Sequence, residues 1–257
     1  MHSYTLRRKS LLGSSVKFFG KWPFIRILGL EEFLSSLGSI FNLFPHLYHL
    51  LYKRSDYAGN VVMRLPLIIY SSIASVSWVA SAAFHGRETL VTERSDYFLA
   101  TLQVLYTTWL AGYRIWGPPS GGENNNKAWW TSWFSGALSV LGFVVYVAYM
   151  VKVKFDYGLH MRLNATLVIL HFLSWFHWAF LGAGRTRSYK WRAVAFVVLI
   201  NLAAVCEVWD FPPVWGIMDA HSAWHLMTAP MIPIWYGFWI EDCKWEGRKI
   251  GKRIEGG

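Results

Sequence analysis

Charged residues and cysteines are both scarce in this chain of 257 residues. Asp, Glu, Lys and Arg make up 16% of the sequence, whereas a soluble domain has about 25%. A water-soluble globular protein is therefore disfavoured. Only two cysteines occur, Cys206 and Cys243, and their separation matches no metal-binding spacing. We expect no disulfide between them and a structural role for each.

Long apolar runs take the place of the missing charge, and 54% of the residues are hydrophobic. Such runs predict an all-α membrane protein, a bundle of seven transmembrane helices. The predicted spans are 33–52, 61–84, 96–116, 129–151, 159–181, 191–209 and 217–240. The connections between them are short, so residues 33–243 form one domain, preceded by a segment over 1–32 and followed by a basic tail over 244–257.

The net charge of +10 raises the question of nucleic-acid binding. The Lys and Arg residues lie at the ends of the spans, which favours a role in membrane topology and no nucleic-acid partner. Of the 25 Lys and Arg residues, 14 lie on the side of the C-terminus, 5 on the opposite side and 6 in the first 32 residues. The positive-inside rule then puts the C-terminus in the cytosol. The six N-terminal basic residues argue the other way, and we give them less weight.

Polar side chains gather on the non-cytosolic side of this topology. Ser81 and His85 are four residues apart at the end of the second span, so they share a helix face. Asp96 lies in the first turn of the third span, and His221 and His225 are four residues apart near the start of the seventh. Antiparallel neighbours bring these helix ends to one depth, and ionisable residues within membrane spans mark function.

Three imidazoles with one open position are a known arrangement for catalytic zinc. We therefore predict Zn²⁺ bound by His85, His221 and His225 between helices two, three and seven. Zinc lowers the pKa of its water to about 7 and polarises a carbonyl group. Asp96 as a proton acceptor and Ser81 as a hydrogen-bond donor to the oxyanion would complete a catalytic site for an ester or amide.

Each of these side chains also has a simpler interpretation. His221 and His225 could only bridge helices by hydrogen bonds, and Asp219 could orient a ligand or cap its helix. His46 and His49, with Asn42 on the same face, form a competing ligand pair on the first span. His171 and His177 are expected to be packing or interfacial residues, and Glu207 and Asp210 are expected at the membrane interface.

At these residues the sequence resembles a superfamily of seven-helix membrane hydrolases and receptors. Its shared pattern is Ser-x3-His near the end of helix two, an Asp at helix three and His-x3-His in helix seven, matched here by Ser81/His85, Asp96 and His221/His225. Within the superfamily, the Per-one-like group of post-GPI-attachment phospholipases is the most similar. The stretches that carry this resemblance are "GKWPFIRILGLEE", "FHGRETLVTERSDYF" and "DFPPVWGIMDAHSAWHLMTAPMIPIWYGFWIED".

The resemblance implies a phospholipase A2-type hydrolase that removes the sn-2 acyl chain from the lipid of GPI-anchored proteins. It implies a membrane of the endoplasmic reticulum or Golgi, with the site facing the lumen. Members of the group carry a cysteine-bearing lumenal segment before the Lys-Trp-Pro-Phe motif, and its absence here predicts a truncated or divergent form. Two alternatives stay open: an alkaline ceramidase-like amide hydrolase and a seven-helix receptor of the same superfamily.

Overall fold

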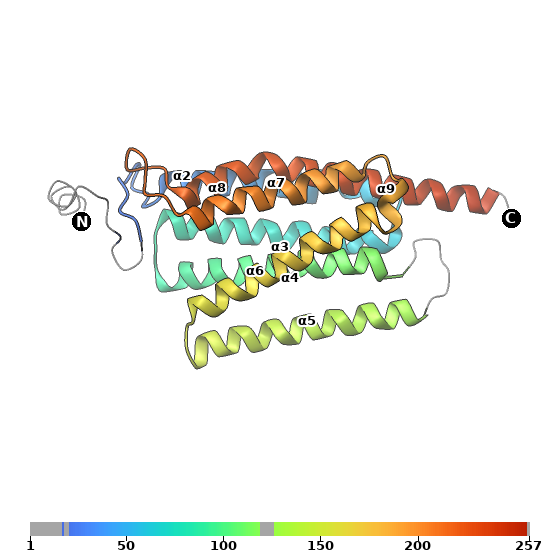
Figure 1. The fold of residues 1–257 in the computed structure, drawn as a ribbon, viewed down its shortest axis with the longest axis horizontal. Coiled ribbons are helices and arrows are strands. Elements are labelled where there is room, and N and C mark those ends of the chain that lie inside the picture. Colours follow the sequence, from blue (N-terminus) through green and yellow to red (C-terminus); the bar gives the residue numbers. More distant parts are fainter. Residues whose placement is uncertain (1–16, 18–20, 119–125, 256–257) are drawn as a thin grey trace.

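The computed structural model describes residues 17, 21–118 and 126–255, and within them the chain is a bundle of long helices (Figure 1). Each predicted span up to residue 209 corresponds to one of these helices. They are α2 (Phe33–Tyr52), α3 (Val61–Gly86), α4 (Leu90–Trp116), α5 (Asn126–Lys152), α6 (Tyr157–Phe180) and α7 (Lys190–Trp209). By length and composition, α3, α5, α6 and α7 are long and apolar enough to cross a membrane.

The last predicted span is divided. It comprises α8 (Ala220–Thr228), a 3-10 turn (Ala229–Met231) and α9 (Ile232–Glu255). Pro230 lies in the turn and has no backbone N–H to donate, which interrupts the α-helical hydrogen bonds without ending the helical path. The backbone at Ala229 and Ile232 stays right-handed helical. Most of the predicted basic tail is therefore the continuation of α9, and only its last two residues lie outside the described part of the chain.

Side-chain caps set where several helices begin. Thr89 forms a capping box with Thr92, so α4 starts at Leu90, six residues before the predicted span. Asp96 consequently lies in the second turn of the helix and not in the first. Asn60 caps α3 by accepting a hydrogen bond from the backbone N–H of Met63, with N–O 3.1 Å.

The apolar core lies toward the end of the bundle where α6 finishes and α9 continues. Large aromatic side chains of these two helices fill it, including Trp175, Trp178, Trp235 and Trp239. Figure 1 shows α2, α7 and α8 along one edge of the bundle and α5 along the other, and α5 packs against α4. In Figure 1 the segment just before α2 lies at one end of this long bundle, and α9 extends from the other end.

A buried ionic network closes the same end as the aromatic core. Arg114 on α4 donates two hydrogen bonds to Asp242 on α9, with N–O 2.6 and 2.9 Å, and one to Glu246 at 2.9 Å. Arg187 reaches Glu246 at 3.3 Å, and the Tyr189 hydroxyl donates to Asp242 at 2.7 Å. The network joins α4, α9 and the segment before α7 through charges that neutralise each other.

The N-terminal segment packs across the other end of the bundle. The backbone N–H of Ile25 donates to the carbonyl of Gly216 at 2.8 Å, and that of Glu32 donates to the carbonyl of His85 at 2.9 Å. Gly216 has φ +75°, a conformation that favours glycine, and an added Cβ would lie 2.9 Å from the Ile25 side chain. These contacts hold Glu32 beside the end of α3. The predicted N-terminal segment over 1–32 lies outside the described residues except for Lys17 and 21–32.

Candidate metal centre

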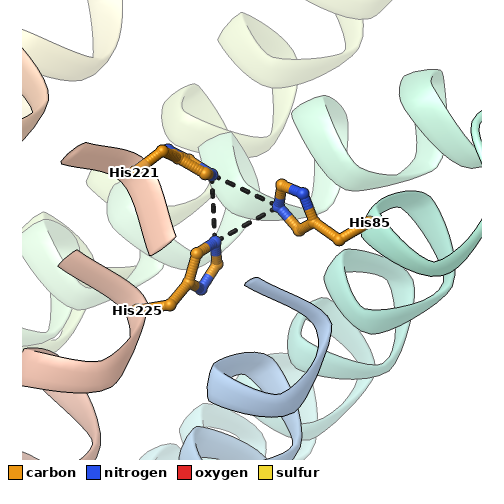
Figure 2. Close-up of side chains that lie close together, drawn as sticks. All are labelled: His85, His221 and His225. Carbon is orange, nitrogen blue, oxygen red and sulfur yellow. Dashed lines mark hydrogen bonds between the residues drawn. The ribbon is translucent and has the colours of Figure 1, made fainter. Parts of the chain in front are cut away.

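Three histidines from two helices meet at the end of the bundle opposite the aromatic core. His85 is the penultimate residue of α3, and His221 and His225 lie one turn apart on α8. Their imidazoles point toward one another (Figure 2). The Nε2 atom of His85 lies 3.2 Å from that of His221 and 3.2 Å from that of His225, and the last two are 3.0 Å apart.

Each imidazole is held from behind through its Nδ1 atom. The Nδ1 of His85 lies 2.7 Å from Glu32 Oε2, and the Nδ1 of His221 lies 2.8 Å from Glu207 Oε2. The Nδ1 of His225 lies 3.4 Å from the hydroxyl of Ser39. Carboxylate or hydroxyl partners on the outer nitrogen are the usual way in which proteins orient metal-binding histidines. A neutral ring that carries its hydrogen on Nδ1 has a lone pair on Nε2, the atom that faces the other two histidines.

The triangle of Nε2 atoms fits a metal ion. Zinc bound tetrahedrally at its usual Zn–N distance separates two nitrogen ligands by about 3.3 Å, close to the observed 3.0–3.2 Å. A proton can bridge only one edge of the triangle, whereas a cation contacts all three lone pairs. Among the described residues, these three histidines are the group whose ligand atoms could together hold a metal ion.

The three ligands differ in their exposure. The side chains of His85 and His225 are 3% and 2% exposed, while those of His221 and Glu207 are each 34% exposed. The site is therefore approached from the side of α7 and α8. At His85, burial is the largest effect and raises the pKa of the Glu32 carboxyl, but the hydrogen bond to His85 and the nearby charges of His85, His221 and Lys21 together outweigh it, so the pKa lies below its ordinary value.

The two predicted catalytic side chains lie next to this triangle. Ser81 is buried one turn before His85 on α3, and its hydroxyl lies 3.0 Å from that of Ser39. The Asp96 carboxyl lies beside Ser81, close enough to His85 and His221 for electrostatic interaction with both. The structure thus brings all five predicted site residues together. Their chemical roles stay predictions.

Ser39 links the ligands to Ser81. It donates its hydrogen to the carbonyl of Ser35 at 2.8 Å, which leaves two lone pairs to accept from His225 and Ser81. The hydrogen of Ser81 therefore points to Ser39 or to Asp96. A serine hydroxyl held in place in this way can turn its hydrogen from such an acceptor to a reacting oxygen and act as a hydrogen-bond donor there.

The remaining polar candidates have other partners. Asp219 caps α8 by accepting a hydrogen bond from the backbone N–H of Ser222 at 2.8 Å. Of its two predicted roles, helix cap or partner of a ligand, the structure shows the cap. His46 binds the hydroxyl of Tyr236 at 2.8 Å, and His49 binds that of Tyr57 at 3.1 Å. This histidine pair is a packing element between helices.

Other predicted polar residues also have packing roles or secure the site indirectly. Asn42 donates to the backbone carbonyl of His225 at 2.7 Å and so fixes α8 against α2. His171 is buried and accepts a hydrogen bond from Trp175 at 3.0 Å, while His177 is exposed and stacks on Trp116. Cys243 is a free, buried thiol.

Sequence analysis missed the residues that orient the ligands. Glu207 was expected only at the membrane interface, and Glu32 and Ser39 were not considered. A signal was available, because the end of helix six and the start of helix one lie at the same end of the bundle as the histidines. The carboxyl of Asp210, the other expected interfacial acid, pairs with Lys17 and accepts a hydrogen bond from Trp22 Nε1 at 2.9 Å.

Fold and site together define a helical, multi-pass membrane protein with a three-histidine metal-type site at one end of its bundle. The Per1-like family profile matches residues 1–243, and the chain belongs to this family.

A protein of Danio rerio named "GPI-specific phospholipase A2-like PGAP3" is 36% identical over 226 residues, which are 88% of this chain and 69% of that protein. The "Protein PER1 homolog" of Schizosaccharomyces pombe is 31% identical over 239 residues, 90% of this chain and 69% of that protein. The human protein named "GPI-specific phospholipase A2-like PGAP3" is 29% identical over 226 residues, with 88% and 68% covered.

Proposed function

We propose that this protein is a zinc-dependent hydrolase that removes the sn-2 acyl chain from the lipid of GPI-anchored proteins. The observation that supports this most is the convergence of three imidazole Nε2 atoms in a chain similar to proteins named as GPI-specific phospholipase A2-like. The two facts are independent, since one is geometric and the other comes from the relatives' names. They agree on ester hydrolysis at a lipid surface.

His85, His221 and His225 would hold the ion, and Glu32, Glu207 and Ser39 would keep each Nε2 lone pair directed at it. Zinc supplies an activated water and polarisation of the ester carbonyl when it is bound. Asp96 accepts the proton of the attacking water, because its carboxyl is beside the ligands without being one of them. Ser81 Oγ turns its hydrogen from Ser39 or Asp96 to the carbonyl oxygen and donates it there as negative charge develops.

The proposal requires the site to meet the lipid at one face of the membrane. We propose that α2, α4 and the α8–α9 unit cross the membrane together with the four apolar helices, giving seven spans. The histidine end then faces the lumen of the endoplasmic reticulum or Golgi with segment 1–32, and the tail 244–257 faces the cytosol. A GPI lipid presents its ester at the lumenal surface, which is where this arrangement puts the site.

A lipid-release assay tests the function directly. Purified protein in vesicles is given diacyl-GPI, ceramide and phosphatidylcholine, and the released products are identified by mass spectrometry. We expect free fatty acid and lyso-GPI from the first substrate only. Release of sphingosine from ceramide would identify an amide hydrolase instead, and no product from any of the three would contradict the enzymatic proposal.

A further inference from the structure

A groove of about 470 Å³ lies between α4, α5 and α6, away from the histidines. Its volume is within the range of about 300–1,000 Å³ that is usual for ligand sites. All three helices line it with side chains that are mostly apolar. They include Thr101 and Leu105 on α4, Ser139 and Gly142 on α5, and Leu163 and Leu167 on α6.

Small residues on α5 create the open space. A Cβ atom added at Gly142 would meet nothing within 4 Å, whereas one added at Gly136 would rest against the Trp109 ring at 3.5–3.7 Å. Small residues in membrane helices commonly let two helices approach closely, as Gly136 does. Gly142 instead borders open space, so the groove exists because α5 has no side chain at this position.

The polar atoms near the groove are satisfied by one another. His160 Nδ1 lies 2.8 Å from the Tyr146 hydroxyl and 3.3 Å from that of Thr101. Asn164 donates to Thr101 at 3.0 Å and to the carbonyl of His160 at 2.9 Å. These bonds tie α4, α5 and α6 together and leave few polar atoms for a ligand. The groove suits a hydrocarbon chain better than a headgroup.

The length of the groove matches one leaflet of a membrane. On α6 its lining runs from Leu159, near the start of the helix, to Leu167. Eight residues of α-helix span about 12 Å, and half of the hydrocarbon thickness of a bilayer is about 15 Å. Leu159 lies at the histidine end of the bundle. The groove therefore extends from that end into the membrane leaflet on the same side as the histidines.

Aromatic side chains connect this upper end of the groove to the site. The Tyr97 ring centroid lies 5.1 Å from that of His160 and 5.8 Å from that of Phe84, and Phe84 lies 5.1 Å from His85. Tyr97 is also the neighbour of Asp96 in sequence. This row of ring contacts runs from His85 to His160, which is bonded to the groove residues Thr101 and Tyr146.

We propose that this groove holds an acyl chain of the lipid whose ester is hydrolysed at the histidines. The proposal rests on the proposed function for the identity of that lipid. The groove acts as a specificity site: burial of each methylene group favours a long chain over a short one. Gly142 is the residue that keeps it open.

Photolabelling tests occupancy without turnover. The full chain in vesicles is irradiated with a phosphatidylinositol that carries a diazirine at the end of its acyl chains, and labelled peptides are located by mass spectrometry. We expect label at Leu105 and Leu163 in the wild type and about tenfold less in Gly142→Phe, because a filled groove excludes about two or more methylene groups. Val144→Phe, on the same helix at a lipid-exposed position outside the groove, is the matched control and should label like the wild type.

Two labelling results would overturn the groove: equal labelling of the wild type and Gly142→Phe, or unlabelled phosphatidylcholine competing as well as phosphatidylinositol, which would mean that any bilayer lipid fills it. Ser139→Leu, a second filling variant, guards against misfolding of the first, and thermal unfolding checks both. A hydrolysis assay is a separate test. Gly142→Phe should lower kcat/KM about tenfold for a long-chain GPI lipid and leave kcat/KM for a short-chain analogue unchanged. A ratio of long-chain to short-chain kcat/KM that is the same in Gly142→Phe as in the wild type would reject the groove. If the wild type releases nothing from any GPI lipid, the proposed function fails, while the labelling result still decides the groove.

Discussion

Glu207 on α7 accepts a hydrogen bond from Nδ1 of His221 on α8, with the nitrogen 2.8 Å from one carboxylate oxygen and 2.9 Å from the other. Glu32 holds His85 in the same way from the start of α2. Two ligands from different helices are therefore oriented by carboxylates from two further helix ends. The site depends on the packing of four helices and not only on the two that supply the histidines.

The first prediction concerns this orientation. Glu207→Gln keeps the shape of the side chain but removes its charge, so His221 should be a weaker and less well oriented ligand. Loss of such a partner typically costs 10–100-fold in metal affinity. Zinc affinity measured by chelator competition should fall by that factor, while Glu241→Gln, which alters a partly exposed carboxylate at the other end of the bundle, should bind zinc like the wild type. Unchanged affinity in Glu207→Gln would mean that the contact does not support a metal.

The second prediction concerns the metal itself. Purified protein should contain about one zinc per chain, and His221→Ala should lose it because one of three ligands is gone. His171→Ala is the control, since His171 is a buried histidine bonded to Trp175 far from the triangle. Elemental analysis of folded protein gives the result. A folded, metal-free preparation with full activity would refute a catalytic zinc.

The third prediction separates catalysis from metal binding. Asp96→Asn should keep its zinc and lose about 10²–10⁴-fold in turnover, because an amide cannot accept the proton of the attacking water. Ser81→Ala should lose about 10²–10³-fold if the serine donates to the oxyanion. Both variants are assayed for zinc content and for release of fatty acid from diacyl-GPI. Wild-type turnover in either variant would show that its role is misassigned.

The helices α2 to α7, and the meeting of the five predicted site residues at one end of the bundle, could be predicted because both depend on local spacing and on topology. Apolar runs mark the spans, and the i,i+4 pairs Ser81/His85 and His221/His225 fix which side chains share a face. The start of α4 was misplaced because the capping box of Thr89 and Thr92 was overlooked. Topology puts Glu207 at the histidine end of the bundle, but its pairing with His221 in particular depends on how two helix ends pack in space. The groove beside Gly142 was out of reach for the same reason.

The fourth prediction concerns stability at the opposite end of the bundle. Asp242 is fully buried and is the partner of both Arg114 and Tyr189. Asp242→Ala should destabilise the fold by about 3–5 kcal/mol, because it leaves a buried guanidinium without its main counter-charge. Thermal or denaturant unfolding in detergent measures the change, with Glu241→Ala, at the adjacent and partly exposed acid, as the control. An equally stable Asp242→Ala protein would show that the network is dispensable for the fold.

The last prediction concerns sidedness, because the chemistry can reach a GPI lipid only from the lumen. The charge distribution, with 14 Lys and Arg on the C-terminal side against 5 on the other, favours a cytosolic C-terminus and a lumenal histidine end. A tag after Gly257 should then be accessible to protease in sealed microsomes. A glycosylation acceptor inserted beside Arg87, in the connection between α3 and α4, should be modified, and one inserted after Lys53 at the other end of α2 should not. The reverse pattern would put the histidines in the cytosolic leaflet. A GPI substrate would then be excluded, and the orientation expected of a receptor of the same superfamily would explain the topology better.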